Sequence, residues 1–218
     1  MIISSPIWIM SPSPDAISMA MRLEDSTPPL MTFETSGELT ASQKQFIVDN
    51  KIDCQIRAKI PYEGDWSNIT YRLDNVSSFA PDLLMVGATL CSRRLREIID
   101  MSYPLVQYFA VDDSRSSAHV REKDYMALYV HAVREVIDLD KSICIKTNLN
   151  TFGQPDQERV LAVRSMVLKA DCQVDVPVFH DPNDGSLFVT DEFAEKAVRA
   201  GIEGITFLDP VSHEQRTG

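Results

Sequence analysis

The order of hydrophobic and polar residues near the end of the chain predicts a β-hairpin. Apolar residues at 176–179 and 187–189 are separated by the sequence Asp-Pro-Asn-Asp-Gly at positions 181–185. Short apolar runs on both sides of a segment rich in aspartate, asparagine, proline and glycine are typical of two strands joined by a turn. We therefore expect two paired strands here.

The residues after this hairpin predict a helix and a closing strand. Thr190 or Asp191 can cap the helix, because their side-chain oxygens accept hydrogen bonds from free backbone amides in the first turn. Gly201 ends it, since glycine adopts the left-handed conformation without strain. Ile205 and Phe207 lie two residues apart, as on one face of a strand. The apolar face of the helix is expected to comprise Phe193, Ala194, Ala197 and Val198.

Upstream, the pattern predicts one clear helix and several further strands. Ser92 can cap a helix whose apolar residues Leu95, Ile98 and Ile99 share one face, and Pro104 prevents its continuation. Residues 62–75 are expected to form a loop, and residues 1–30 a strand and loop. Further strands are predicted at residues 54–58, 106–111, 125–133, 142–147 and 165–168, with a short helix at 41–50 and an apolar element of undefined type at 81–87. The period of residues 125–133 is ambiguous, and a helix is the alternative there.

These elements predict an α+β fold, mainly an antiparallel sheet with a few packed helices, because most expected strands are joined by short turns. The 218 residues are expected to form a single domain. Residues 82–208 make its α+β body in this interpretation. Residues 1–80 are a candidate N-terminal lobe of undefined structure.

The net charge of the chain limits the classes of binding partner that are expected. The chain has 32 acidic and 21 basic residues, which gives a formal net charge of −11. Nucleic acids and anionic membranes attract basic surfaces, so neither is expected as a partner. Two interpretations stay open: the charge only keeps the protein soluble, or it attracts a basic protein partner.

The distribution of cysteines and apolar residues favours a cytoplasmic protein. The four cysteines lie far apart in the sequence and lack the C-x-x-C spacing of zinc sites. Reduced thiols are therefore expected. The sequence also shows no recognisable signal peptide and no apolar run of the roughly 20 residues that a membrane helix needs.

Catalytic motifs are not found, so we expect no enzyme activity, no cofactor and no metal. Neither a G-x-S-x-G nucleophile motif nor a glycine-rich phosphate loop occurs. His213 begins a zinc-protease-like motif, but Thr217 replaces its second histidine. Residues 181–186 match a calcium loop only in part, because Gly185 takes its fifth ligand position. His131 lies among strand-like residues, where a packed histidine is expected more than a general base.

Three arginines near one predicted helix start leave an alternative open. Arg93, Arg94 and Arg96 follow Ser92, where positive charge opposes the helix dipole. They can pair with the many acidic side chains. Together with a carboxylate such as Asp138 they could instead hold a small anion. The second alternative would make the protein an unrecognised enzyme or a small-anion-binding protein.

Several segments resemble, in the same order, the Imm11-type family of bacterial immunity proteins, first catalogued as a domain of unknown function. Residues 90–99 are similar to the family's "S-x-x-L-r-e-i-l" helix, residues 106–111 to its next strand, and residues 136–142 to its "v-v-D-x-l-D-x-x-S" segment. The hairpin, helix and strand at 178–207 fit best, although His180 stands where the family often has arginine. The resemblance covers residues 82–208.

This resemblance implies an immunity protein of a polymorphic toxin system, which binds a cognate toxin and so protects the producing cell in interbacterial competition. Such a protein needs no active site. An acidic surface suits a basic toxin such as a nuclease. The protein is expected to occlude the toxin's active site or substrate groove, and an adaptor without a toxin partner is a further alternative. Contacts are expected from the acidic loops at Asp112, Asp113, Asp181 and Asp184.

Overall fold

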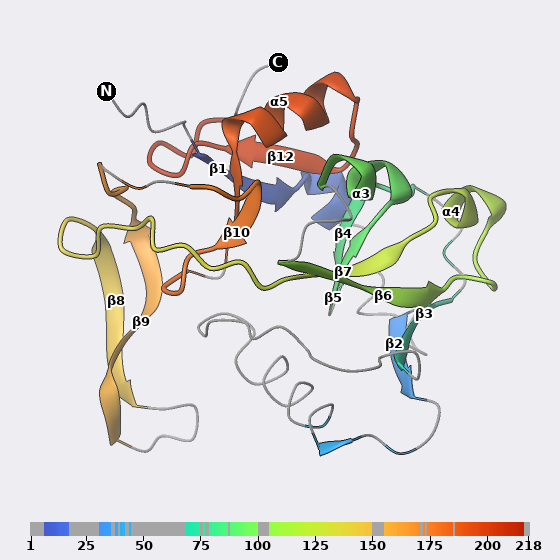
Figure 1. Cartoon of the computed structure of the whole chain (residues 1–218), viewed down its shortest axis with the longest axis horizontal. Helices are drawn as coiled ribbons and strands as arrows, with labels where there is room; N and C mark the ends of the chain where they lie inside the picture. The colour runs from blue at the N-terminus through green and yellow to red at the C-terminus, as the bar shows by residue number, and fades with distance from the viewer. Residues whose placement is uncertain are drawn as a thin grey trace.

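The computed structural model describes residues 7–17, 31–35, 38, 40–41, 44, 69–74, 76, 79–86, 88–99, 105–149, 155–170, 172, 174–184 and 186–215. Within these ranges the strands form three β-sheets, and helices lie on them (Figure 1). The helix predicted at residues 41–50 lies largely outside the described residues, and the strand predicted at 54–58 lies wholly outside them.

The first sheet has four antiparallel strands in the order β10, β11, β1, β12. β10 (Val178–His180) and β11 (Leu187–Thr190) form the predicted hairpin, and β12 (Ile205–Leu208) is the predicted closing strand. β1 (Ile7–Pro12) lies between β11 and β12, where Ile9 is paired with Phe188 on one side and Leu208 on the other. The N-terminal strand is thus built into the sheet of the C-terminal segment.

Helix α5 (Asp191–Arg199) covers this sheet (Figure 1). The Thr190 hydroxyl accepts a hydrogen bond from the amide of Phe193, which confirms the predicted cap. The indole N–H of Trp8 donates to the Asp191 carboxylate at 2.8 Å and fixes the helix start to β1. Val198 is 42% exposed, so its predicted place on the buried face was wrong. The side chains that α5 does bury are Phe193, Ala194 and Ala197.

The second sheet has six strands and is mixed. Only its β3–β6 pair is parallel; the other pairs are antiparallel. Helix α3 (Arg93–Ile99) follows β5, as predicted, and the Ser92 hydroxyl accepts from the amide of Leu95. In order across the sheet the strands are β2 (Met31–Thr35), β3 (Ile69–Leu73), β6 (Val106–Asp112), β7 (Met126–Val130), β5 (Ala88–Cys91) and β4 (Leu83–Val86). The predicted α+β fold with mainly antiparallel sheets is confirmed.

Strand β3 lies where a loop was predicted, and its pairing also concerns the predicted domain organisation. Residues 69–73 were expected in a loop because asparagine and aspartate flank them, but pairing with β2 and β6 makes them a strand. β1, β2 and β3 all pair with strands of the two large sheets. These pairings support a single domain over a separate lobe at residues 1–80, and that organisation stays a prediction.

Both faces of the six-stranded sheet carry a hydrophobic core. On β7, Leu128 and Val130 belong to the core shared with the four-stranded sheet. Ala127 and Tyr129 point to the opposite face, since side chains alternate along a strand, and pack in a second core with Val120 of helix α4 (Ala118–Glu122). Strands buried on both faces explain the nearly continuous apolar sequence of β7.

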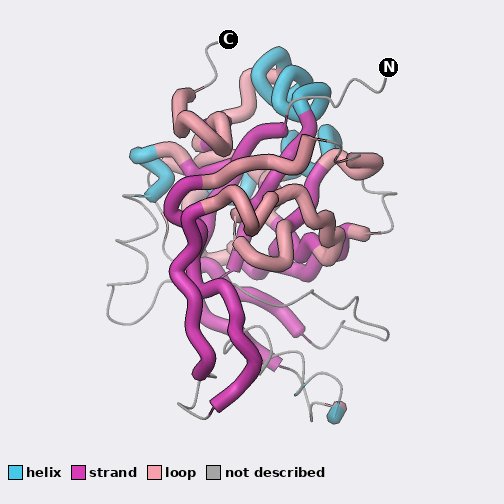
Figure 2. The backbone as a smooth tube through the Cα atoms, turned by 90° about the vertical axis from the view of Figure 1, so that its left-hand side faces the viewer, coloured by secondary structure: helices cyan, strands magenta, loops and turns pink. Residues whose placement is uncertain are grey.

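The third sheet is a ribbon of β8 (Ile143–Leu149) and β9 (Pro155–Ser165), which extends away from the two larger sheets (Figures 1 and 2). Among the described strands, β8 and β9 pair only with each other. The second of these strands was predicted at residues 165–168, which was wrong. The sequence of β9 begins with polar residues and lacks the alternation by which a half-buried strand is recognised.

Candidate functional site

Arg93 and Arg94 of α3 contact different parts of the protein. Arg93 pairs with Glu97 one turn further along the helix, at 3.2 Å, and both side chains are exposed. Arg94 reaches the C-terminal end of α5, where it donates hydrogen bonds to the carbonyl oxygens of Ala200 and Gly201. Its cation lies where helix carbonyls accumulate negative charge. These two arginines therefore do not form a joint anion site.

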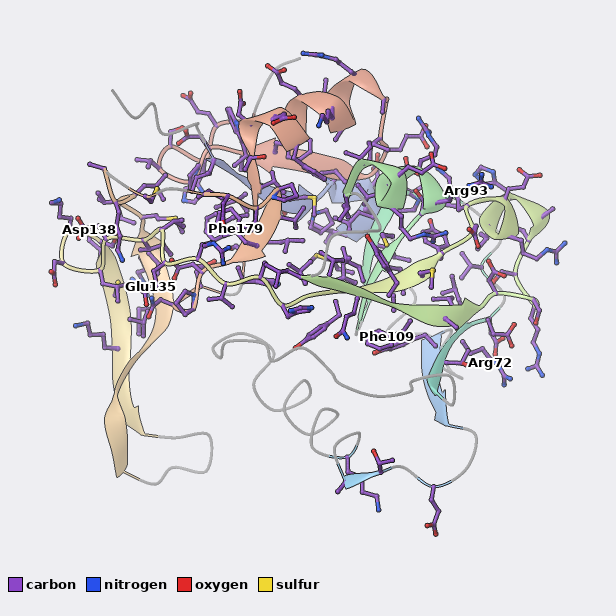
Figure 3. All side chains as sticks on the ribbon, viewed as in Figure 1. Arg72, Arg93, Phe109, Glu135, Asp138 and Phe179 are labelled. Carbon is purple, nitrogen blue, oxygen red and sulfur yellow. The ribbon has the colours of Figure 1, made fainter. Side chains whose placement is uncertain are left out.

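Arg96 has a third environment. Its side chain is buried and forms a 2.5 Å ion pair with Asp124, whose carbonyl oxygen it also contacts. The proposed carboxylate Asp138 lies at the opposite end of the molecule from Arg93 in Figure 3, and it pairs with Lys141. All three arginines bind acidic side chains or carbonyl oxygens of the protein itself, as in the first of the two alternatives. A common site for a small anionic substrate is not formed.

Asp112 ends β6 and Asp113 follows it before α4, and we call these two residues the β6-end patch. The Asp112 carboxylate accepts a hydrogen bond from the amide of Ser114 at 3.0 Å and lies 3.6 Å from the Arg72 guanidinium. Both contacts, that with Ser114 foremost, lower the pKa of Asp112. Burial raises the pKa of Asp113. Both side chains are partly exposed, so they remain open to a partner.

Asp181, in the β10–β11 turn, has a structural environment. Its side chain is 2% exposed, and its carboxylate accepts hydrogen bonds from the amides of Val136 and Ile137 at 2.8 and 3.0 Å. Its other oxygen accepts from the amide of Asn183 at 2.8 Å. The carboxylate thus joins the hairpin turn to the segment that follows β7. Its oxygens are satisfied internally.

Asp184 occupies the same turn but faces a hollow. One carboxylate oxygen accepts from the amide of Ser186 at 2.7 Å, and among the described residues no lysine or arginine pairs with this carboxylate. The hollow has a volume of about 360 Å³. It is lined by segments of four strands and by the turn, including Met10, Met85, Ala162, Val163, Asn183 and Asp184.

The four predicted contact residues therefore lie in two places. The β6-end patch adjoins α4, on one side of the molecule (Figure 1). The turn with Asp181 and Asp184, which we call the hairpin-turn patch, adjoins β9 on the side where the β8–β9 ribbon stands (Figure 1). Sequence reasoning could not find the hollow, because its walls come from segments far apart in the chain.

His131 is packed, as the sequence indicated. It is 6% exposed, and neither ring nitrogen has a hydrogen-bond partner within the described part of the chain. The ring lies 6.0 Å from that of Tyr129. Burial lowers the pKa of His131, because the charged imidazolium would lose its hydration.

The two partial metal motifs, at residues 181–186 and from His213, lie only in part within the described residues. No group of three or more metal-ligating His, Cys, Asp or Glu side chains occurs among the residues described. In the calcium-like turn, the Asp181 carboxylate is already engaged by backbone amides. Within the same ranges, no helix has the length and apolar character that crossing a membrane requires.

Comparison with known families identifies the family of this chain. Residues 19–212 match the model of the Immunity protein family (Imm11). The chain belongs to this family. The match starts before residue 82, so it extends into the region where short motifs alone showed no resemblance. A search of curated proteins found no match to the chain. Membership in Imm11 supports the role of an immunity protein, and that role implies a cognate toxin as the binding partner.

Proposed function

We propose that this Imm11 protein binds and neutralises a cognate bacterial toxin in the cytoplasm of the producing cell, and that it has no catalytic activity of its own. The observation that carries the proposal is the family match over residues 19–212. The mode of action is occlusion of the toxin's active site or substrate groove. The biological setting is a polymorphic toxin system in interbacterial competition.

The toxin is proposed to be basic and of nuclease type. A nuclease needs a positive surface to hold phosphates, and a protein with a formal net charge of −11 complements such a surface. Electrostatic attraction of this kind raises association rates, which matters for an inhibitor that must act before its target cuts DNA or RNA.

Contacts are proposed at the β6-end patch and the hairpin-turn patch. Asp112, Asp113 and Asp184 are partly exposed and can face a partner directly. Asp181 is buried and holds the turn in place through the amides of Val136 and Ile137. Its contribution to binding is therefore to position Asp184 rather than to touch the toxin.

The arginine alternative has less support. An enzyme or anion-binding protein built on Arg93, Arg94 and Arg96 needs these side chains to converge, yet each has separate partners. An adaptor without a toxin partner is the remaining alternative, and the family match favours the immunity protein over it.

Co-expression with the toxin encoded by the neighbouring gene tests the proposal. Cells that carry the toxin and this protein should survive, whereas cells with the toxin and an empty vector should die. The purified protein should also abolish the activity of the purified toxin at a one-to-one ratio, as expected for occlusion of its active site.

A variant with a disrupted fold provides the control. Gly204→Ala places a methyl group against Pro81 and should lower protection in proportion to the amount of folded protein. Survival with the wild-type protein that is no better than with the empty vector would refute the proposed function.

A further inference from the structure

An exposed apolar face leads along the β8–β9 ribbon to the hollow. Ile143 and Ile145 are 63% and 37% exposed and lie two residues apart on β8, with a register shift of the ribbon between Ile143 and Cys144. Ile145 is paired across the ribbon with Ala162, and side chains of directly paired residues lie on the same face. Ala162 in turn lines the hollow. Ile145 thus adjoins the hollow through Ala162, and Ile143 lies two residues before it on β8.

The charge at this surface is not neutralised within the protein. Asp184 at the hollow has no lysine or arginine partner among the described residues. Three other acidic residues near the base of the ribbon differ in this respect. Three ion pairs satisfy them: Glu135 with Lys169 at 3.2 Å, Asp138 with Lys141 at 2.7 Å, and Asp175 with Arg134 at 2.7 Å.

We propose that the hollow receives a lysine or arginine side chain of the cognate toxin, and that apolar toxin residues beside it pack on Ile143 and Ile145. The inference rests on the proposed function and names the contact surface for it. Met85, which is half-buried, can contact the aliphatic stem of the cation while its charged end meets Asp184. Methionine suits this role, since its flexible thioether adapts to irregular partners.

The volume of the hollow favours a side chain of a partner protein over a whole small ligand. A volume of about 360 Å³ is near the lower end for pockets that enclose a whole small ligand. It is ample for one or two side chains that anchor an interface at its centre, with flatter contacts around them. The exposed face of β8 supplies these flatter contacts. Burial of both isoleucines by the toxin would also explain why such exposed apolar residues occur on a projecting ribbon.

Binding of a catalytically inactivated toxin domain from the neighbouring gene tests this surface. Asp184→Asn keeps the oxygen that accepts from the Ser186 amide but removes the charge, so the turn is preserved. We expect this variant to raise the Kd about tenfold or more, and to weaken its dependence on salt. The double variant Ile143→Ser with Ile145→Ser should raise the Kd by a similar factor of about ten, because an exposed face loses its apolar contacts.

Glu192→Gln is the matched control. It removes one negative charge from α5, where Glu192 forms an exposed ion pair with Lys196, and it should change the Kd by less than about twofold. Circular dichroism and thermal unfolding should show the same fold for all variants. Hydrogen exchange in the complex should show protection in β8, in residues 160–165 and in residues 183–187.

The outcomes separate this inference from the proposed function. Failure of the wild-type protein to bind the toxin domain would refute the function itself. The proposed contact surface alone would be refuted if the wild-type protein bound tightly and Asp184→Asn and the double variant left the Kd unchanged. Protection confined to the β6-end patch would refute it in the same way. A wild-type dimer that the isoleucine variant dissociates, with toxin affinity unaltered, would also overturn it, because the ribbon would then bind a second copy of this chain.

Discussion

The carboxylate of Asp82 and the hydroxyl of Ser92 meet at 2.6 Å, although neither side chain is exposed to solvent. The same carboxylate accepts from the ammonium group of Lys123 at 3.3 Å and from the amide of Glu203 at 2.8 Å. One buried charge therefore joins the start of α3, the end of α4 and the segment before β12.

Replacement of this carboxylate should destabilise the protein strongly. Asp82→Ala leaves Lys123 without its buried partner and several donors unsatisfied, so we expect a loss of about 3–5 kcal/mol in the free energy of unfolding. Ser92→Ala removes one hydrogen bond and the cap of α3, and should cost about 1–2 kcal/mol. Urea unfolding measures both values. Equal losses in the two variants would contradict a network centred on Asp82.

Two glycines with positive φ give a matched pair of substitutions. At Gly204, with φ of +79°, an added Cβ would lie 2.2 Å from the Cβ of Pro81. At Gly201, with φ of +62°, the nearest atom would be 3.8 Å away. Gly201→Ala should cost about 1–2 kcal/mol for the left-handed backbone alone. Gly204→Ala should cost at least about 1 kcal/mol more, because backbone or proline must move. Thermal unfolding of both variants checks this order.

The sequence predicted those elements whose signals are local. The Thr190 cap and the short apolar strand at 187–189 depend on neighbours within a few positions, and both were found as expected. Residues 69–73 and β9 were missed because their strand conformation depends on partners far along the chain or on a ribbon without a buried face. Asp181 and Asp184 look alike in sequence, yet only folding shows that one is buried and the other faces the hollow.

The buried His131 should make stability depend on pH. Its pKa is lowered by burial below the ordinary value of 6.5, so the unfolded chain binds a proton more readily than the folded one. The free energy of unfolding should therefore be highest above pH 6.5 and should fall as pH decreases through that value. His131→Phe should reduce this slope. Denaturant unfolding between pH 5 and 8 measures it, and an identical slope in the variant would contradict the assignment.

The thiol of Cys91 should resist alkylation. Burial raises its pKa to about 12, because a thiolate would lose its hydration in the core. Cys144 and Cys172 are only half-buried and should react faster with iodoacetamide at pH 8. Mass spectrometry of native protein identifies the modified sites, and the same reaction in urea supplies the control. Rapid labelling of native Cys91 would show that the core opens locally.

Charge reversal should identify which acidic patch attracts the toxin. The double variant Asp112→Lys with Asp113→Lys alters the β6-end patch, and Asp184→Lys alters the hairpin-turn patch. The variant in the patch that faces the toxin should associate about 3–10 times more slowly at low salt, with a flatter salt dependence. Stopped-flow mixing with the toxin domain measures the rates. Unaltered rates in both variants would refute acidic contacts at either patch.

The position of β1 has a consequence for when protection begins during synthesis. Ile9 pairs with Leu208, so the four-stranded sheet joins segments about 200 residues apart in the chain, a separation that slows folding. A ribosome-bound chain that still lacks β11 and β12 leaves β1 with two open edges. The hairpin turn that presents Asp184 also belongs to this late-forming sheet. Nascent chains should therefore give the cell no defence, and its immunity should depend on the stock of finished molecules.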